Sequence, residues 1–132
     1  MPHIPKWSPS LSVHNAVLDE QHIMLIETAN ELLGTLRDSL WHPEHAFNLL
    51  EEMLGMSRRH DALEEELLAS HNCPTLEQHR AIHRRVEGEL QQWLTQARDG
   101  WFDKAGLARY VEHFMSHHLA ETDMPVKGYL QG

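Results

Sequence analysis

Residues 46–68 read AFNLLEEMLGMSRRHDALEEELL, and this stretch decides the fold. Its apolar residues return every three or four positions, which is the period of one face of an α-helix. The face consists of Ala46, Leu49, Met53, Met56, His60, Leu63, Glu64 and Leu67. Because His60 and Glu64 stand one turn apart on it, both are expected to point into the core.

Three further segments carry the same pattern, separated by short breaks rich in proline, glycine and asparagine. The pattern predicts helices at about residues 18–38, 44–70, 75–97 and 103–122, preceded by an extended N-terminal arm at residues 1–17. Four such helices with short loops bury their apolar faces together by packing as an antiparallel up-down-up-down bundle. We therefore predict an all-α four-helix bundle that forms a single domain over residues 1–132.

Composition excludes several classes of partner. The formal net charge of −9 repels phosphate backbones, so no nucleic acid is expected. The sequence has no apolar run long enough for an export signal or a membrane span, so no membrane association is expected either. Cys73 is the only cysteine and cannot form an internal disulfide, which favours a cytoplasmic setting.

The predicted bundle buries six polar side chains. A single histidine on an apolar face is more often a hydrogen-bonded core residue than a metal ligand. Six uncompensated polar groups would cost about 6 to 18 kcal/mol, which is as much as the whole stability of a domain. A bound cation satisfies all of them at once, so we predict a metal site. The six residues are His22, His60, Glu64, His79, His83 and His118.

Imidazole and carboxylate donors without a thiolate suit iron, manganese or zinc better than calcium or magnesium. Six or seven donors exceed the needs of one tetrahedral ion, so the set favours two metals bridged by carboxylates. The sequence contains no Glu-x-x-His motif of the kind that ferritin-like di-iron enzymes use.

The motifs resemble the hemerythrin family, in its bacterial branch, from Trp7 to about Tyr129. They are Trp7, Ser12-Val13, Leu18-Asp19-Glu20-Gln21-His22, His60-x-x-x-Glu64-Glu65, His79-x-x-x-His83 and His118-Leu119-x-x-x-Asp123. The resemblance implies two iron ions joined by an oxo or hydroxo group. It assigns His79, His83 and His118 to one iron and His22 and His60 to the other, with Glu64 and Asp123 as bridges. Dioxygen would bind at the iron with two histidines.

Asp123 comes from the resemblance alone. On a regular helix it would point about 140° away from His118, and Glu121 competes for its role. Pro125 disfavours regular helix just before it, so a looser, π-like turn is expected to bring Asp123 back to the metal. His113 and His117 form another His-x-x-x-His pair, which we expect on the solvent side.

The expected ligand pocket departs from the family pattern. An aromatic residue usually follows the second-helix histidine, where this chain has Asp61, and Phe114 replaces a usual tryptophan. A more polar pocket admits water and protons, so we expect fast autoxidation. The pocket residues that we predict are Leu25, Asp61, Phe114, Met115 and Leu119.

The expected function is binding of dioxygen, or of small anions such as azide, in an oxygen- or redox-sensing domain. A downstream signalling domain would follow it in the parent protein. The alternatives are an oxygen carrier or store that serves an oxygenase and, ranked lower, a peroxide- or nitric-oxide-consuming di-iron enzyme. We do not expect an enzyme, because no positioned acid-base residue other than Asp61 is evident.

Overall fold

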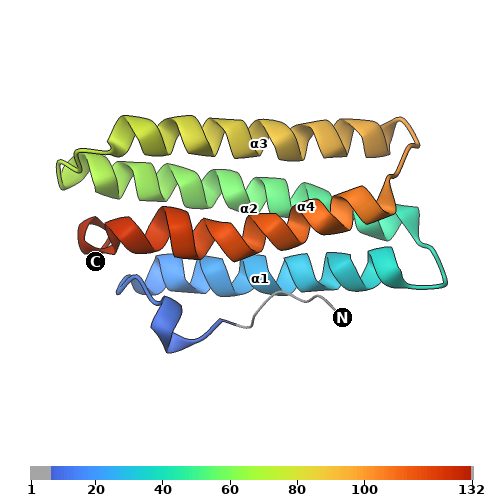
Figure 1. Cartoon of the computed structure of the whole chain (residues 1–132), viewed down its shortest axis with the longest axis horizontal. Helices are drawn as coiled ribbons and strands as arrows, with labels where there is room; N and C mark the ends of the chain where they lie inside the picture. The colour runs from blue at the N-terminus through green and yellow to red at the C-terminus, as the bar shows by residue number, and fades with distance from the viewer. Residues whose placement is uncertain (1–6, 132) are drawn as a thin grey trace.

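The computed structural model describes residues 7–131, apart from the side chains of residues 119–121. Its four long helices are α1 (Ala16–Arg37), α2 (Pro43–Ser70), α3 (Leu76–Arg98) and α4 (Lys104–His117). Consecutive helices run in opposite directions, which confirms the predicted all-α four-helix bundle (Figure 1). α1 packs along α2, α2 along α3 and α1 against α4, whereas α3 and α4 approach each other less closely.

The predicted N-terminal arm is partly folded. Residues 1–6 lie outside the described part of the chain, and Pro9–Leu11 form a short 3-10 helix within the arm that we predicted as extended. The segment ends at Asn15, whose side chain accepts hydrogen bonds from the backbone N–H groups of Val17 and Leu18 and so caps α1. The Asn15 amide also donates to the carbonyl of Leu130 at 2.9 Å, which ties the start of α1 to the end of the chain.

Local signals explain the other helix ends. Pro43 occupies the first turn of α2, where its missing N–H is not needed. Gly100 adopts a φ of +87° just after α3, a conformation that favours glycine. Asp103 caps α4 by accepting from the backbone N–H of Gly106 at 2.9 Å.

Two apolar clusters enclose a layer of polar residues. The larger cluster draws on all four helices and includes Leu25 of α1 and Met53 of α2. The smaller one lies by the C-terminal end of the described chain and includes Leu18 of α1, Leu68 of α2 and Leu130. Along α1, His22 falls between Leu18 of the smaller cluster and Leu25 of the larger one, so apolar side chains flank the polar layer on both sides along the bundle axis.

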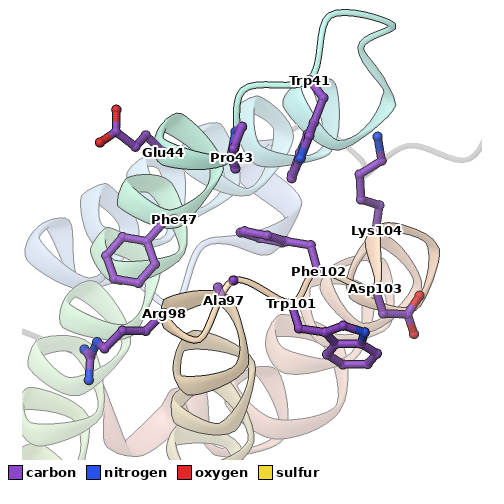
Figure 2. A pocket seen from close by; sticks show the side chains of 11 residues that line it. Trp41, Pro43, Glu44, Phe47, Ala97, Arg98, Trp101, Phe102, Asp103 and Lys104 are labelled. Atoms are coloured by element: carbon purple, nitrogen blue, oxygen red, sulfur yellow. The ribbon is translucent and has the colours of Figure 1, made fainter.

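A separate open pocket of about 880 Å³ lies where the loop between α1 and α2 meets the loop between α3 and α4. Trp41, Phe47, Trp101 and Phe102 are among its lining residues (Figure 2). None of the predicted metal ligands lines it. No helix of the described chain is both long enough and apolar enough to cross a membrane.

Candidate metal centre

The end of the fourth helical segment changes its winding at the predicted site. Residues His118–Asp123 form a π-helix, followed by a 3-10 helix over Met124–Tyr129. The wider π turn places Asp123 in contact with the histidines of the bundle core, and Asp123 is fully buried. The looser turn expected before Pro125 is therefore present. The side chain of its competitor Glu121 lies outside the described residues.

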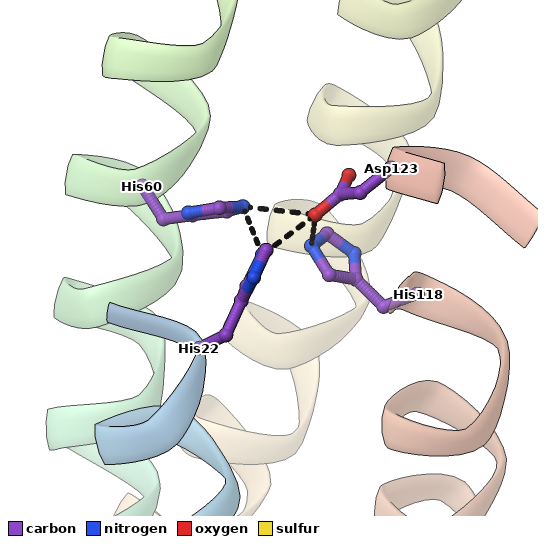
Figure 3. A group of neighbouring side chains, drawn as sticks. All are labelled: His22, His60, His118 and Asp123. Atoms are coloured by element: carbon purple, nitrogen blue, oxygen red, sulfur yellow. Dashed lines mark hydrogen bonds and ion pairs between the residues drawn. The ribbon is translucent and has the colours of Figure 1, made fainter. Parts of the chain in front are cut away.

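Three imidazoles converge on one carboxylate oxygen (Figure 3). Oδ2 of Asp123 lies 2.7 Å from Nε2 of His22, 3.2 Å from Nε2 of His60 and 3.3 Å from Nε2 of His118. The Nε2 atoms of His22 and His60 are 3.0 Å apart. The four side chains come from α1, α2 and the π-helix, and their ligand atoms are close enough to hold a metal ion.

A second group shares Asp123 and continues toward α3. It consists of Glu64, His83 and Asp123, all buried. Glu64 lies between two histidines, because Oε2 is 3.2 Å from Nε2 of His60 and Oε1 is 3.2 Å from Nε2 of His83. Both carboxylates thus lie between imidazoles from different helices, which is a geometry suited to bridging two cations.

His79 is the one predicted ligand that belongs to neither group. Its Nε2 lies 2.9 Å from the carbonyl oxygen of Thr122, and its Nδ1 lies 3.3 Å from that of Thr75. Its ring centroid is 6.0 Å from that of His83. The structure also groups His118 with His22 and His60, whereas the family resemblance pairs it with His79 and His83.

Unpartnered polar atoms test whether the donor set fits a metal. Both carboxylate oxygens of Glu64, Nε2 of His83, Nε2 of His118 and Oδ1 of Asp123 are buried without a hydrogen-bond partner among the described residues. Buried polar atoms in native proteins nearly always have partners. Since these atoms are nitrogen and oxygen donors that face one another, they fit one or two transition-metal cations.

Neighbouring charges shift the pKa values of the buried histidines and of Asp123. Burial alone would lower the pKa of His60, but the nearby carboxylates of Asp123 and Glu64 raise that pKa to about 10. Burial likewise opposes protonation of His83, yet Glu64 and Asp61 raise its pKa to about 9. Burial would raise the pKa of Asp123, but the charge of His118 and hydrogen bonds from the histidines hold it well below its usual value. The carboxylates and imidazoles of this layer therefore favour a positive charge among them, which a bound cation would supply.

Outer partners orient two of the rings. Nδ1 of His83 donates to Oε2 of Glu65 at 2.8 Å, and Nδ1 of His60 donates to Oε1 of Gln21 at 3.1 Å. Both bonds leave Nε2 as the atom that faces the cluster. Our sequence reasoning assigned no role to Gln21 or Glu65, although each directly adjoins a predicted ligand in the sequence.

Asp61 is buried beside the cluster, with Oδ1 3.6 Å from Nε2 of His83. Burial and a hydrogen bond with Glu87 raise the pKa of Asp61 to about 8. Glu87, which our reasoning missed, lies one turn beyond His83 on α3, and this spacing is the signal that would have found it.

The other predicted pocket residues are placed as follows. Leu25, Phe114 and Met115 are buried, and the Phe114 ring lies 5.3 Å from that of His118. The side chain of Leu119 lies outside the described residues. His113 and His117 are exposed, as expected from their position on the solvent side of α4.

Known proteins resemble this chain over nearly all of its length. It is 27% identical over 127 residues to proteins named bacteriohemerythrin from three strains of Campylobacter jejuni subsp. jejuni. Each alignment covers 92% of this chain and 91% of the relative. No protein-family model matches the chain. These relatives confirm the resemblance to the hemerythrin family that the sequence motifs indicate.

Proposed function

We propose that this chain is a non-heme di-iron protein that binds dioxygen or a related small ligand, in an oxygen- or redox-sensing role. The observation that carries the proposal is the buried layer of facing imidazoles and carboxylates with unpartnered nitrogen and oxygen atoms. A single ion would leave part of this donor set unused, which supports two. The similarity to bacteriohemerythrins supports iron as the metal.

The proposed ligands are those named from the sequence. The nitrogen donors would come from His22, His60, His79, His83 and His118. His79 would join them once its Nε2 leaves the Thr122 carbonyl. Glu64 and Asp123 would supply bridging oxygens, because Glu64 already lies between imidazoles of two helices and Asp123 between imidazoles of three. Two iron ions bound there would supply an open coordination position and exchange electrons with a small ligand.

The protein's own groups set the surroundings of that position. Glu65 and Gln21 keep the His83 and His60 rings turned inward by accepting their Nδ1 protons. Asp61, buried with Oδ1 3.6 Å from Nε2 of His83, places a carboxyl group that can carry a proton beside that position. With iron bound, a proton donor at this place would favour oxidation of the metals by oxygen over long-lived oxygen storage. This supports a sensor whose oxidation state carries the signal more than a long-lived oxygen store.

Metal analysis tests the proposal directly. Protein purified from iron-supplied cells should contain about two irons per chain. Protein that contains zinc in place of iron would contradict the proposed di-iron centre. A reduced protein that takes up oxygen and keeps it for hours would favour the carrier or store over the sensor.

A further inference from the structure

A second pair of histidines with the spacing of metal ligands lies on the surface of α4. His113 and His117 are exposed and stand one turn apart, and the centroids of their rings are 3.8 Å apart. His79 and His83, which are predicted ligands on α3, have the same spacing, and their ring centroids are 6.0 Å apart. Two histidines four positions apart on one face of a helix can bind one metal ion together. The rings of the surface pair thus lie closer together than those of the predicted pair in the core.

A backbone contact determines which ring nitrogen of His117 carries the hydrogen. Nδ1 of His117 lies 2.9 Å from the carbonyl oxygen of His113, and a carbonyl only accepts, so Nδ1 donates. Nε2, on the opposite side of the ring, is then the nitrogen whose lone pair a metal ion can use when the imidazole is neutral. Histidines that bind metals commonly donate their other ring nitrogen in this way, which fixes the ring for coordination. His83 of the candidate centre is oriented by Glu65 in the same manner.

The surface pair lines a cleft that reaches the candidate metal centre. The cleft lies between α3 and α4, and its volume is about 260 Å³. Its lining includes His113 and His117, and also His118, a predicted ligand, and Thr122. The carbonyl oxygen of Thr122 lies 2.9 Å from Nε2 of His79. His118 and His79 are 7% and 6% exposed, whereas the other three predicted histidine ligands are each 1% exposed. An ion held by the surface pair would therefore border the part of the polar layer that lies nearest to solvent.

The charges around the pair admit a cation. Arg85 and Glu89, one turn apart on α3, line the same cleft with opposite charges and so leave little net charge there. The chain as a whole carries a formal net charge of −9, which attracts cations from solution. Imidazole nitrogens suit iron, zinc, copper and nickel, whereas calcium and magnesium prefer oxygen ligands. The class of ligand that fits the pair is therefore a divalent transition-metal ion, with water completing its coordination.

We propose that His113 and His117 bind one divalent transition-metal ion at the surface of α4, and that iron(II) passes from this pair through the cleft to His118 as the buried centre is loaded. On arrival the ion meets His118, and the His79 ring joins it as Nε2 leaves the Thr122 carbonyl. The transfer to His118 rests on the proposed function, whereas metal binding at the surface pair does not.

Zinc titration tests the surface site. In calorimetry the parent should bind one zinc ion per chain more than His113→Ala, whether or not the buried centre already holds metal. His113 is changed because His117 adjoins His118, and alanine preserves the helix. His71→Ala is the matched control: His71 is exposed and its Nδ1 also donates to a backbone carbonyl, that of Leu67 at 3.0 Å, but no histidine stands four positions away. This control should bind as much zinc as the parent. Equal zinc binding by the parent and His113→Ala would overturn the proposal.

Loading kinetics test the transfer. Chelator-stripped protein is mixed with limiting cobalt(II), a coloured substitute for iron(II), and filling of the buried centre is followed by visible absorption. His113→Ala should fill about tenfold more slowly than the parent but reach the same final absorption, and His71→Ala should fill at the parent rate. Equal rates for the parent and His113→Ala would overturn the transfer. Absence of iron from protein made in iron-supplied cells would instead count against the proposed function, and the zinc titration would still decide whether the surface pair binds metal.

Discussion

Loading with metal should stabilise this protein strongly, and the size of the effect follows from the unpartnered atoms of the polar layer. Five such atoms belong to predicted ligands: Oε1 and Oε2 of Glu64, Nε2 of His83, Nε2 of His118 and Oδ1 of Asp123. Each buried unsatisfied atom costs about 1 to 3 kcal/mol, so together they cost about 5 to 15 kcal/mol. Ion pairs at 3.2 to 3.6 Å offset part of this, so we use the lower bound.

Coordination should therefore raise the free energy of unfolding by about 5 kcal/mol or more, which is a large part of a typical domain's stability. For a chain of this size each kcal/mol moves the Tm by about 2 to 8 °C, so the Tm should rise by about 10 °C or more. Circular dichroism melts of chelator-stripped and iron-loaded protein at the same pH measure this difference directly.

Two variants on α2 sharpen the test. Glu64→Leu removes a buried carboxylate whose two oxygens lack partners in the described structure, and it should abolish the iron-dependent rise in Tm. Glu66→Leu makes the same chemical change at an exposed position of the same helix and should keep the rise. The reasoning is refuted if stripped and loaded parent protein melt within a few degrees of each other, or if Glu64→Leu responds to iron as the parent does.

Three further outcomes follow from the same site. His118→Ala should lose the absorption of the iron centre while His117→Ala retains it, and the reverse result would mean that the metal lies on the solvent side of α4. The pKa values of His60 and His83 are raised to about 10 and 9, so both rings hold protons at pH 7 that a metal ion must displace. The affinity for the metal ion should therefore rise between pH 7 and 9 and fall on acidification. Calorimetry in buffers of different ionisation enthalpy should detect the release of these protons on metal binding. Asp61→Phe removes the buried proton source, so the oxygen-bound form should oxidise more slowly in spectrophotometric decay, and equal rates would remove Asp61 from the explanation.

The helices and the polar layer could be predicted because their signals are local. The period of apolar residues places His22, His60 and His83 on buried faces without knowledge of any neighbour. In the structure these histidines are each 1% exposed. The same reasoning overstated the buried face of α2, because Met56 and Leu63 are only partly buried while Leu50, which it left out, is fully buried. Periodicity averages over a helix, whereas burial depends on where each neighbour crosses it.

Asp123 shows what local reasoning misses. A regular helix would turn it away from His118, and only the π-helix ahead of Pro125 brings it to the histidines. The family resemblance supplied this residue because motifs record the result of such distortions without explaining them. The physical cause is the proline, which removes a backbone donor and disfavours the regular turn before it.

The sequence by itself determined that four amphipathic helices form a bundle with a layer of buried polar residues, for which it predicts a bound cation. Only the tertiary structure decided that Asp123 contacts His22, which lies 101 positions earlier in the chain. It also decided that His118 groups with His22 and His60, while His79 contacts the carbonyl of Thr122. The cleft between α3 and α4 that His118 lines is likewise a result of packing. The periodic pattern specifies the face of each helix that is buried. The relative height, rotation and separation of neighbouring helices arise only when all four pack together, and these quantities set the distances between donor atoms and the path that leads to them.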